Sequence, residues 1–170
     1  MFTLRHVAQQ FALLFSLLLI SAVPAQAAEV QRHGQAYVVY LPGNADIGGV
    51  LERLQSELGG QNWEVLQIQH IDQGMKKYDM QIDNKLILAC KSQYLAQAIK
   101  EDPYISLLIP CRFTLFRETA PGGKGQRVVL GVVDPVAEAK AMNIKQYRAA
   151  EKAAQELKTV LEGVASYYAR

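Results

Sequence analysis

The sequence has few of the residues and motifs that catalytic or metal sites usually need. Its 170 residues include only two cysteines and three histidines. No two histidines stand at helical ligand spacing, and no Gly-x-Ser-x-Gly elbow or Cys-x-x-Cys pair occurs. The acidic residues are scattered, without a paired general acid and base. We therefore expect a protein that is not an enzyme, with no catalytic residue and no cofactor.

Phosphate and nucleic-acid sites are not expected either. Gly122-Gly123-Lys124-Gly125 is rich in glycine but is followed by a strand pattern, whereas a P-loop continues with Ser or Thr and a helix. The formal net charge is only +2. Nucleic-acid-binding proteins concentrate positive charge on one face, so this balance excludes nucleic acid from the expected partners.

Residues 1–27 are predicted to be a signal peptide. Arg5 and His6 give a short basic start, and the apolar run 11–23 follows. This run is shorter than the roughly 18–20 residues that a membrane-spanning helix needs. Ala25-Gln26-Ala27 then forms a small-x-small cleavage pattern. We expect cleavage between Ala27 and Ala28, a periplasmic or secreted protein, and no membrane attachment after cleavage.

The remaining sequence alternates strand and helix patterns. Strands are predicted at 35–41, 63–71, 85–90, 107–118 and 127–133. Helices are predicted at 47–58, around Tyr94–Ile99 with an end at Asp102-Pro103, and from 135 onward. Asp46 and Asp134 stand where they can cap helices. Pro110 marks a bulge, an edge or the true start of its strand. The order β-α-β-β-α-β-β-α predicts one α+β domain at 35–135, after a leader at 28–34, with helices on one face of the sheet.

Several short segments of this domain are similar to one known family. From about residue 46 to residue 134 the chain resembles the domain of unknown function 302 (DUF302) family. The resemblance is carried by Gly60-Gln61-Asn62-Trp63, Leu86-Ile87-Leu88-Ala89-Cys90, Ala98 with Asp102-Pro103, Leu108-Ile109-Pro110-Cys111 and Val132-Val133-Asp134-Pro135. Where the family often has Cys-Asn-Pro, this chain has Cys90-Lys91-Ser92. The resemblance implies the fold, but it brings no activity and no site residues.

Cys90 and Cys111 carry most of the chemistry that the sequence offers. In an exported protein two cysteines favour a disulfide, which we slightly prefer to two inert buried thiols. Strand alternation places Cys90 with Leu86 and Leu88, and Cys111 with Phe113, which predicts that both point inward. A parallel crossover between their strands would separate them. Cys90 also precedes a helix, where the partial positive charge of the N-terminus could make a thiol reactive.

His70 is the remaining candidate ligand. It is predicted to share a strand face with Leu66 and Ile68, with Gln67 and Gln69 on the other face. Together with Cys90 and Cys111, His70 would make a three-ligand site for a soft metal such as copper or zinc. A histidine at a strand end more commonly satisfies its nitrogens locally, so this metal site stays an alternative.

Aromatic residues and the C-terminal helix point to binding rather than to catalysis. Tyr37, Tyr40 and Tyr94 either line a ligand cavity or belong to the core. The segment 136–170 repeats apolar residues every three or four positions, which is typical of an amphipathic helix. We expect this helix to pack on its own sheet, and the alternative is a homodimer or a partner docked through it. The leading hypothesis is a non-catalytic module that binds a small apolar ligand or a protein partner. The alternative is a thiol-redox or soft-metal protein that uses Cys90 and Cys111.

Overall fold

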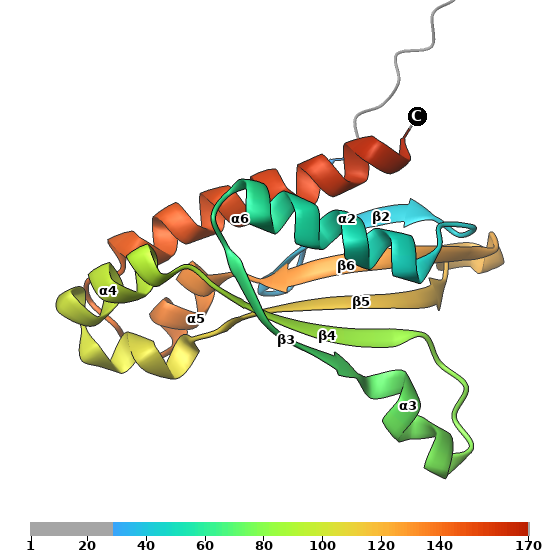
Figure 1. The fold of residues 1–170 in the computed structure, drawn as a ribbon, viewed down its shortest axis with the longest axis horizontal. Coiled ribbons are helices and arrows are strands. Elements are labelled where there is room, and N and C mark those ends of the chain that lie inside the picture. Colours follow the sequence, from blue (N-terminus) through green and yellow to red (C-terminus); the bar gives the residue numbers. More distant parts are fainter. Residues whose placement is uncertain (1–28, 170) are drawn as a thin grey trace, which may run out of the picture.

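The computed structural model describes residues 29–169, which form one six-stranded sheet with helices on one face (Figure 1). The strand order is β1-β2-β6-β5-β4-β3, and every neighbouring pair is antiparallel. The signal peptide and the cleavage site predicted from the sequence lie outside the described residues. The strands are β1 (Gln31–His33), β2 (Ala36–Pro42), β3 (Glu64–His70), β4 (Asn84–Cys90), β5 (Cys111–Thr119) and β6 (Gln126–Val133).

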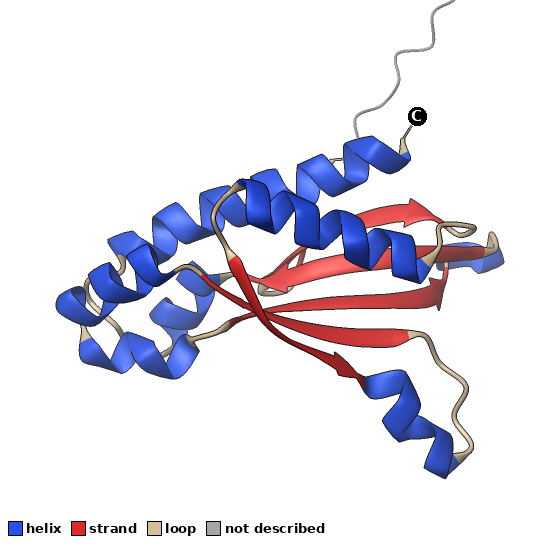
Figure 2. Cartoon of the chain, viewed as in Figure 1, coloured by secondary structure: helices blue, strands red, loops and turns tan. Residues whose placement is uncertain are grey.

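The helices and strands confirm the predicted α+β class. Figure 2 shows α2 and α6 lying along one face of the sheet, with further helices at one end. The main helices are α2 (Ile47–Gly60), α4 (Ser92–Glu101), α5 (Pro135–Ala141) and α6 (Arg148–Tyr168); the short ones are α3 (Ile71–Met75), η1 (Lys76–Tyr78), η2 (Pro103–Leu108) and η3 (Pro121–Gly123). Within residues 29–169, none of these helices is long and apolar enough to cross a membrane.

The predicted helix caps are confirmed. The Asp46 carboxylate accepts a hydrogen bond of 2.7 Å from the Gly49 amide at the start of α2. Asp134 accepts one of 2.9 Å from the Val136 amide, with Pro135 in the first turn of α5. These carboxylates satisfy amides that would otherwise lack a partner at a helix start.

Three local predictions are corrected. The segment from 135 onward is two helices rather than one, because the chain leaves α5 at Met142 and Asn143 adopts a left-handed φ of 59°. The strand predicted at 107–118 begins only at Cys111, since Leu107 and Leu108 belong to η2 and Pro110 has no amide to donate. Pro110 therefore marks the true start of the strand.

The third correction concerns β3. A register shift between Val65 and Gln67 interrupts its pairing with β4, so Leu66 and Ile68 do not share a buried face. Leu66 is exposed, whereas Ile68 stands opposite Ile87 and packs against the core. A single extra residue in one strand is enough to change which side chains point inward.

The hydrophobic core lies between the sheet and the helices α2 and α6. Alternate side chains of the strands, including Ile87, Phe113 and Leu130, are completely buried there. They meet Leu54 of α2 and Leu157 of α6 in the same cluster. The apolar side of α6 is buried within the chain, which confirms its predicted packing on its own sheet.

Candidate functional site: an apolar cavity at one end of the sheet

A small cavity lies where the ends of β4 and β5 meet α4, η2 and α6. It encloses about 50 Å³, and its walls are almost entirely apolar. The wall from α6 consists of alanines, whose short side chains leave this space unfilled. The lining residues are Trp63, Ala89, Cys90, Lys91, Tyr94, Leu95, Ala98, Ile105, Leu108, Ile109, Cys111, Pro135, Ala149, Ala150 and Ala153. The space is partly open to solvent, and apolar walls of this kind favour a small apolar molecule or the apolar end of a larger one.

The cavity also gathers the sequence segments that carry the family resemblance. Each of these segments, although far apart in the chain, contributes at least one lining residue. Trp63 comes from the first, Ala89 and Cys90 from the second, Ala98 from the third, Leu108, Ile109 and Cys111 from the fourth, and Pro135 from the last. The segments therefore share one place in the fold.

One wall of the cavity is bounded by a polar cluster around Glu156 of α6. Trp63 Nε1 donates to Oε2 of Glu156 at 2.9 Å, and the Tyr94 hydroxyl donates to Oε1 at 2.6 Å. Lys91 Nζ donates to both oxygens, at 3.0 and 2.8 Å, and to the carbonyl of Gln61 at 2.9 Å. The Trp63 and Tyr94 rings meet edge to face, with centroids 6.1 Å apart. This Glu156 cluster connects α6, the start of α4 and the loop before β3.

The cluster shifts the protonation equilibria of two of its members. Burial alone would raise the pKa of Glu156, but the hydrogen bonds from Lys91, Tyr94 and Trp63 outweigh it and hold that pKa below its usual value. Burial, together with the Tyr94 hydroxyl's hydrogen bond to Glu156, raises the pKa of Tyr94 to about 12. At neutral pH the cluster is thus an ionised carboxylate held by a neutral phenol and a lysine.

Glu156 was not identified from the sequence, where it falls on the polar side of an amphipathic helix. It follows Ala153 by three positions and directly precedes Leu157, both of which are buried. It therefore lies at the boundary of the apolar face. The sequence offered one indication of this role: Glu156 stands beside the apolar positions of its helix, and the chain has a single tryptophan, Trp63, that needs a hydrogen-bond acceptor when buried.

The predicted disulfide is not formed, and both cysteines are free. The expectation that both point inward was wrong for Cys90. Ala89, not Cys90, pairs with Cys111 across β4 and β5, so Ala89 and Cys111 share the helix-covered face. Cys90 follows Ala89 and therefore lies on the alternate side of β4. The strands are antiparallel rather than joined by a parallel crossover, which is why the two thiols nevertheless lie near the same end of the sheet and line one cavity.

Neither thiol has the electrostatic surroundings of a reactive cysteine. Burial raises the pKa of Cys90, and this effect exceeds the opposing hydrogen bond from the Lys91 amide. Burial raises the pKa of Cys111 to about 12, with a further contribution from Cys90. A reactive cysteine needs its pKa lowered, so the helix start at Ser92 does not activate Cys90.

His70 lies away from the two thiols. It pairs with Lys85 at one end of the β3–β4 ladder, whereas Cys90 pairs with Glu64 at the other end. The structure therefore does not bring His70, Cys90 and Cys111 together. Among residues 29–169, no three His, Cys, Asp or Glu side chains are grouped so that they could hold a metal ion.

The three tyrosines considered as cavity residues lie in three different parts of the fold. Tyr94 lines the cavity, whereas Tyr40 lies on the sheet face without helices. Tyr37 lies in a second polar cluster, where its hydroxyl donates to Asp134 Oδ2 at 3.0 Å and Arg32 donates to the same oxygen at 3.1 Å. Asp134 is only 3% exposed, and its other oxygen caps α5. This arrangement anchors the start of α5 to β1 and β2, and we assign it a structural role.

Fold and cavity together define a small α+β protein with an antiparallel sheet, helices on one side, and an apolar cavity at one end. The chain belongs to the family described as domain of unknown function DUF302, whose model matches residues 37–164. This match confirms the resemblance noted from the sequence and extends it through most of α6.

A solved structure supports the same fold. The chain is similar to the protein described as "Crystal structure of uncharacterized conserved protein DUF302 from Bacillus stearothermophilus", with 17% sequence identity and a TM-score of 0.68. The match covers 78% of this chain and 99% of that chain. No curated protein matches this chain.

Proposed function

We propose that this protein is a non-catalytic binding module that holds a small apolar ligand, or the apolar end of a larger one, in the cavity. The observation that carries this proposal is the convergence of the family segments on a space with apolar walls. The Glu156 cluster supports it, because ionic hydrogen bonds from three elements keep that side of the cavity in place.

The test is to fill the cavity from the helix side. Xenon, a small apolar atom that binds in apolar cavities, serves as the probe in NMR titrations of the purified protein. We expect xenon to bind the original protein, and Ala153→Leu to abolish binding because leucine occupies the space of about 50 Å³. Ala165→Leu is the matched control, since Ala165 is buried on the same helix but does not line the cavity.

Two results would contradict the ligand proposal. Xenon would fail to bind the original protein, or it would bind a folded Ala153→Leu protein as tightly as the original. If neither of these results is found, mass spectrometry of an organic extract of protein purified from its own cells identifies the natural ligand.

The second candidate function is a thiol-redox or soft-metal role for Cys90 and Cys111. It is favoured by one observation, that both thiols line the same cavity. Their raised pKa values count against it, because metal binding and thiol exchange both use the thiolate. Native mass spectrometry distinguishes the two functions: stoichiometric copper or zinc that is lost in Cys111→Ser favours the second.

We further propose that the protein is exported through the signal peptide at residues 1–27 and acts in the periplasm or outside the cell. This proposal depends on the basic start, the short apolar run and the cleavage pattern in the sequence. N-terminal sequencing of the protein from the periplasmic fraction should give Ala28 as the first residue. Protein that retains residues 1–27 in a membrane fraction would contradict it.

A further inference from the structure

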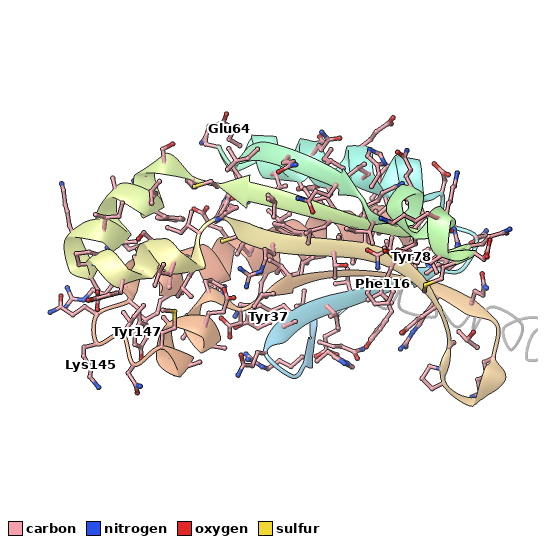
Figure 3. All side chains as sticks on the ribbon, turned by 90° about the horizontal axis from the view of Figure 1, so that it is seen from below. Tyr37, Glu64, Tyr78, Phe116, Lys145 and Tyr147 are labelled. Carbon is pink, nitrogen blue, oxygen red and sulfur yellow. The ribbon has the colours of Figure 1, made fainter. Side chains whose placement is uncertain are left out.

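The sheet face opposite the helices is apolar, which is unusual for a face that lies open within a single chain. Antiparallel sheets with one solvated face normally alternate apolar and polar residues along each strand. In β6, by contrast, positions 128–133 contain no polar side chain, so both faces of this strand are apolar. Figure 3 views the sheet from this side. The apolar residues that line the open face are Val38, Tyr40, Leu86, Phe116, Val129 and Val133, and its polar side chains are His33, Arg112, Thr114 and Glu118.

Some side chains of the open face are shielded from solvent by their neighbours on the same face. Val129 and Val38 are only 3% and 7% exposed although no helix covers them. The space in front of the face measures about 280 Å³. Such a hollow with apolar walls is typical of a surface that receives another apolar surface.

Gly131 is one of the residues that line the hollow, and aromatic rings stand beside it. Gly131 pairs with Val38 on one side and with Thr114 on the other. The Val38 side chain packs closely beside this position, since a Cβ atom built on Gly131 would meet Val38 Cγ1 at 3.0 Å. Two positions along β6, Val129 pairs with Tyr40 and Phe116. The open face thus carries a depression, which we call the Gly131 hollow, next to bulky aromatic side chains.

The charges at the rim of the open face are balanced. Arg127 Nε donates to Glu118 at 2.8 Å, and the Arg127 guanidinium covers the Tyr40 ring at 3.6 Å. Arg112 pairs with Glu138 of α5. Each arginine is matched by a glutamate, so the face would neither repel an identical face nor attract a strongly charged partner.

We propose that the open face binds the open face of a second copy of this chain about a two-fold axis, with Phe116 of each copy packed over the Gly131 hollow of the other. A two-fold contact brings the same patch of both copies together, so the patch must be complementary to itself in shape and charge. The Phe116 ring beside the Gly131 hollow meets the requirement for shape. The balanced ion pairs at the rim meet the requirement for charge. The apolar side of α6 is already buried within the chain, which leaves the sheet as the larger apolar surface. The residues of this proposed contact are different from those that line the ligand cavity. Evidence against one proposal therefore leaves the other unaffected.

Light scattering and sedimentation equilibrium of protein purified from cells that express the full-length chain test the proposal. We expect the mass of two chains. Phe116→Lys should raise the dissociation constant of the dimer at least about 100-fold, because it places a charge in the apolar contact. The matched control is Tyr104→Lys, which adds the same charge at an exposed aromatic residue of η2 and should leave the dimer intact.

A second variant keeps the test decisive if Phe116→Lys does not fold. Thr114→Trp fills the Gly131 hollow with an apolar side chain and should also weaken the dimer, while circular dichroism reports that the fold is kept. A monomeric original protein would overturn the proposal, and so would a folded Phe116→Lys or Thr114→Trp protein that dimerises like the original. A single chain that carries a bound small molecule, or a complex with a different protein, would also overturn it.

Discussion

The two faces of the sheet are both apolar, but only one of them is covered within the chain. On the covered face, Ile87, Phe113 and Leu115 are completely buried beneath α2 and α6. On the open face, Leu86 and Phe116 of the same two strands remain half-buried. Neighbouring residues of one strand therefore have similar hydrophobicity and very different burial.

This difference separates two uses of apolar surface in one domain. Side chains buried by the chain's own helices stabilise the fold, because their area leaves water whenever the chain folds. The half-buried side chains of the open face, such as Leu86 and Phe116, contribute fully only when something else covers them. Substitutions on the two faces should therefore affect different measurements, namely unfolding on one face and association on the other.

The largest effect is expected for Phe113→Ala on the covered face. It should lower the free energy of unfolding by about 3–5 kcal/mol, because it removes a fully buried ring and leaves a cavity. The matched change Phe116→Ala should cost less than about 1 kcal/mol in the monomer. Urea unfolding at concentrations low enough to exclude association measures both. Equal losses would show that the two faces do not differ in this way.

The next largest effect concerns the polar cluster at the end of the covered face. Glu156→Gln should destabilise the protein by about 2 kcal/mol, since it leaves Lys91 without its carboxylate partner. The side chain of Lys91 is 11% exposed, so water can compensate only in part. Glu162→Gln, on an exposed position of the same helix, is the control and should change stability by less than about 0.5 kcal/mol. If the two variants unfold alike, the Glu156 cluster does not stabilise the helix layer.

A pH dependence of stability is expected from Tyr94 and Cys111 at the cavity end of the covered face. The pKa values of Tyr94 and Cys111 are raised to about 12 in the folded chain from ordinary values of 10.0 and 9.0. The unfolded chain loses these protons at lower pH, so stability is fully present below about pH 9 and falls as the pH rises toward 12. Tyr94→Phe should make the decline between pH 10 and 12 shallower, as measured by urea unfolding. Identical slopes in both proteins would contradict this assignment.

The smallest effect on stability is expected from reducing agents. Because Cys90 and Cys111 are free, dithiothreitol should leave the melting temperature unchanged. Thiol labelling of the native protein should modify Cys90 before Cys111, whose pKa is raised to about 12. A melting temperature that falls by several degrees on reduction would instead indicate a disulfide.

The sequence predicted the elements of the fold better than their faces. Strand alternation, helix caps at Asp46 and Asp134, and the family resemblance were sufficient for the α+β class and most of the element order. They missed β1, which lies in the segment 28–34 predicted as a leader, and the division of the C-terminal helix into α5 and α6. Antiparallel pairing of β4 with β5 and the register shift in β3 could not be predicted, because both depend on contacts between strands rather than on one strand's pattern. The register of β4 against β5 decides that Cys90 and Cys111 face different ways, and the antiparallel pairing of β3 with β4 places His70 at the other end of the ladder from Cys90.

The candidate site was predicted only in part for a similar reason. Cys90, Cys111 and Tyr94 were named as candidates and line the cavity. The cavity itself depends on alanines of α6 lying opposite α4 and η2, which no local pattern specifies. Glu156 has the periodicity of a solvent-facing residue, and only the packing of α6 brings it to Trp63 and Lys91.

The strand order has a consequence for how the chain acquires its structure during synthesis. Strands β3, β4 and β5 are each paired with the next in sequence, so this part of the sheet can form as soon as the ribosome has released it. Strand β2 must wait for β6, as the contact between Tyr37 and Asp134, 97 positions apart, illustrates. Contacts between such distant segments slow folding. Strand β2 therefore stays unpaired with its main partner until β6 has been synthesised.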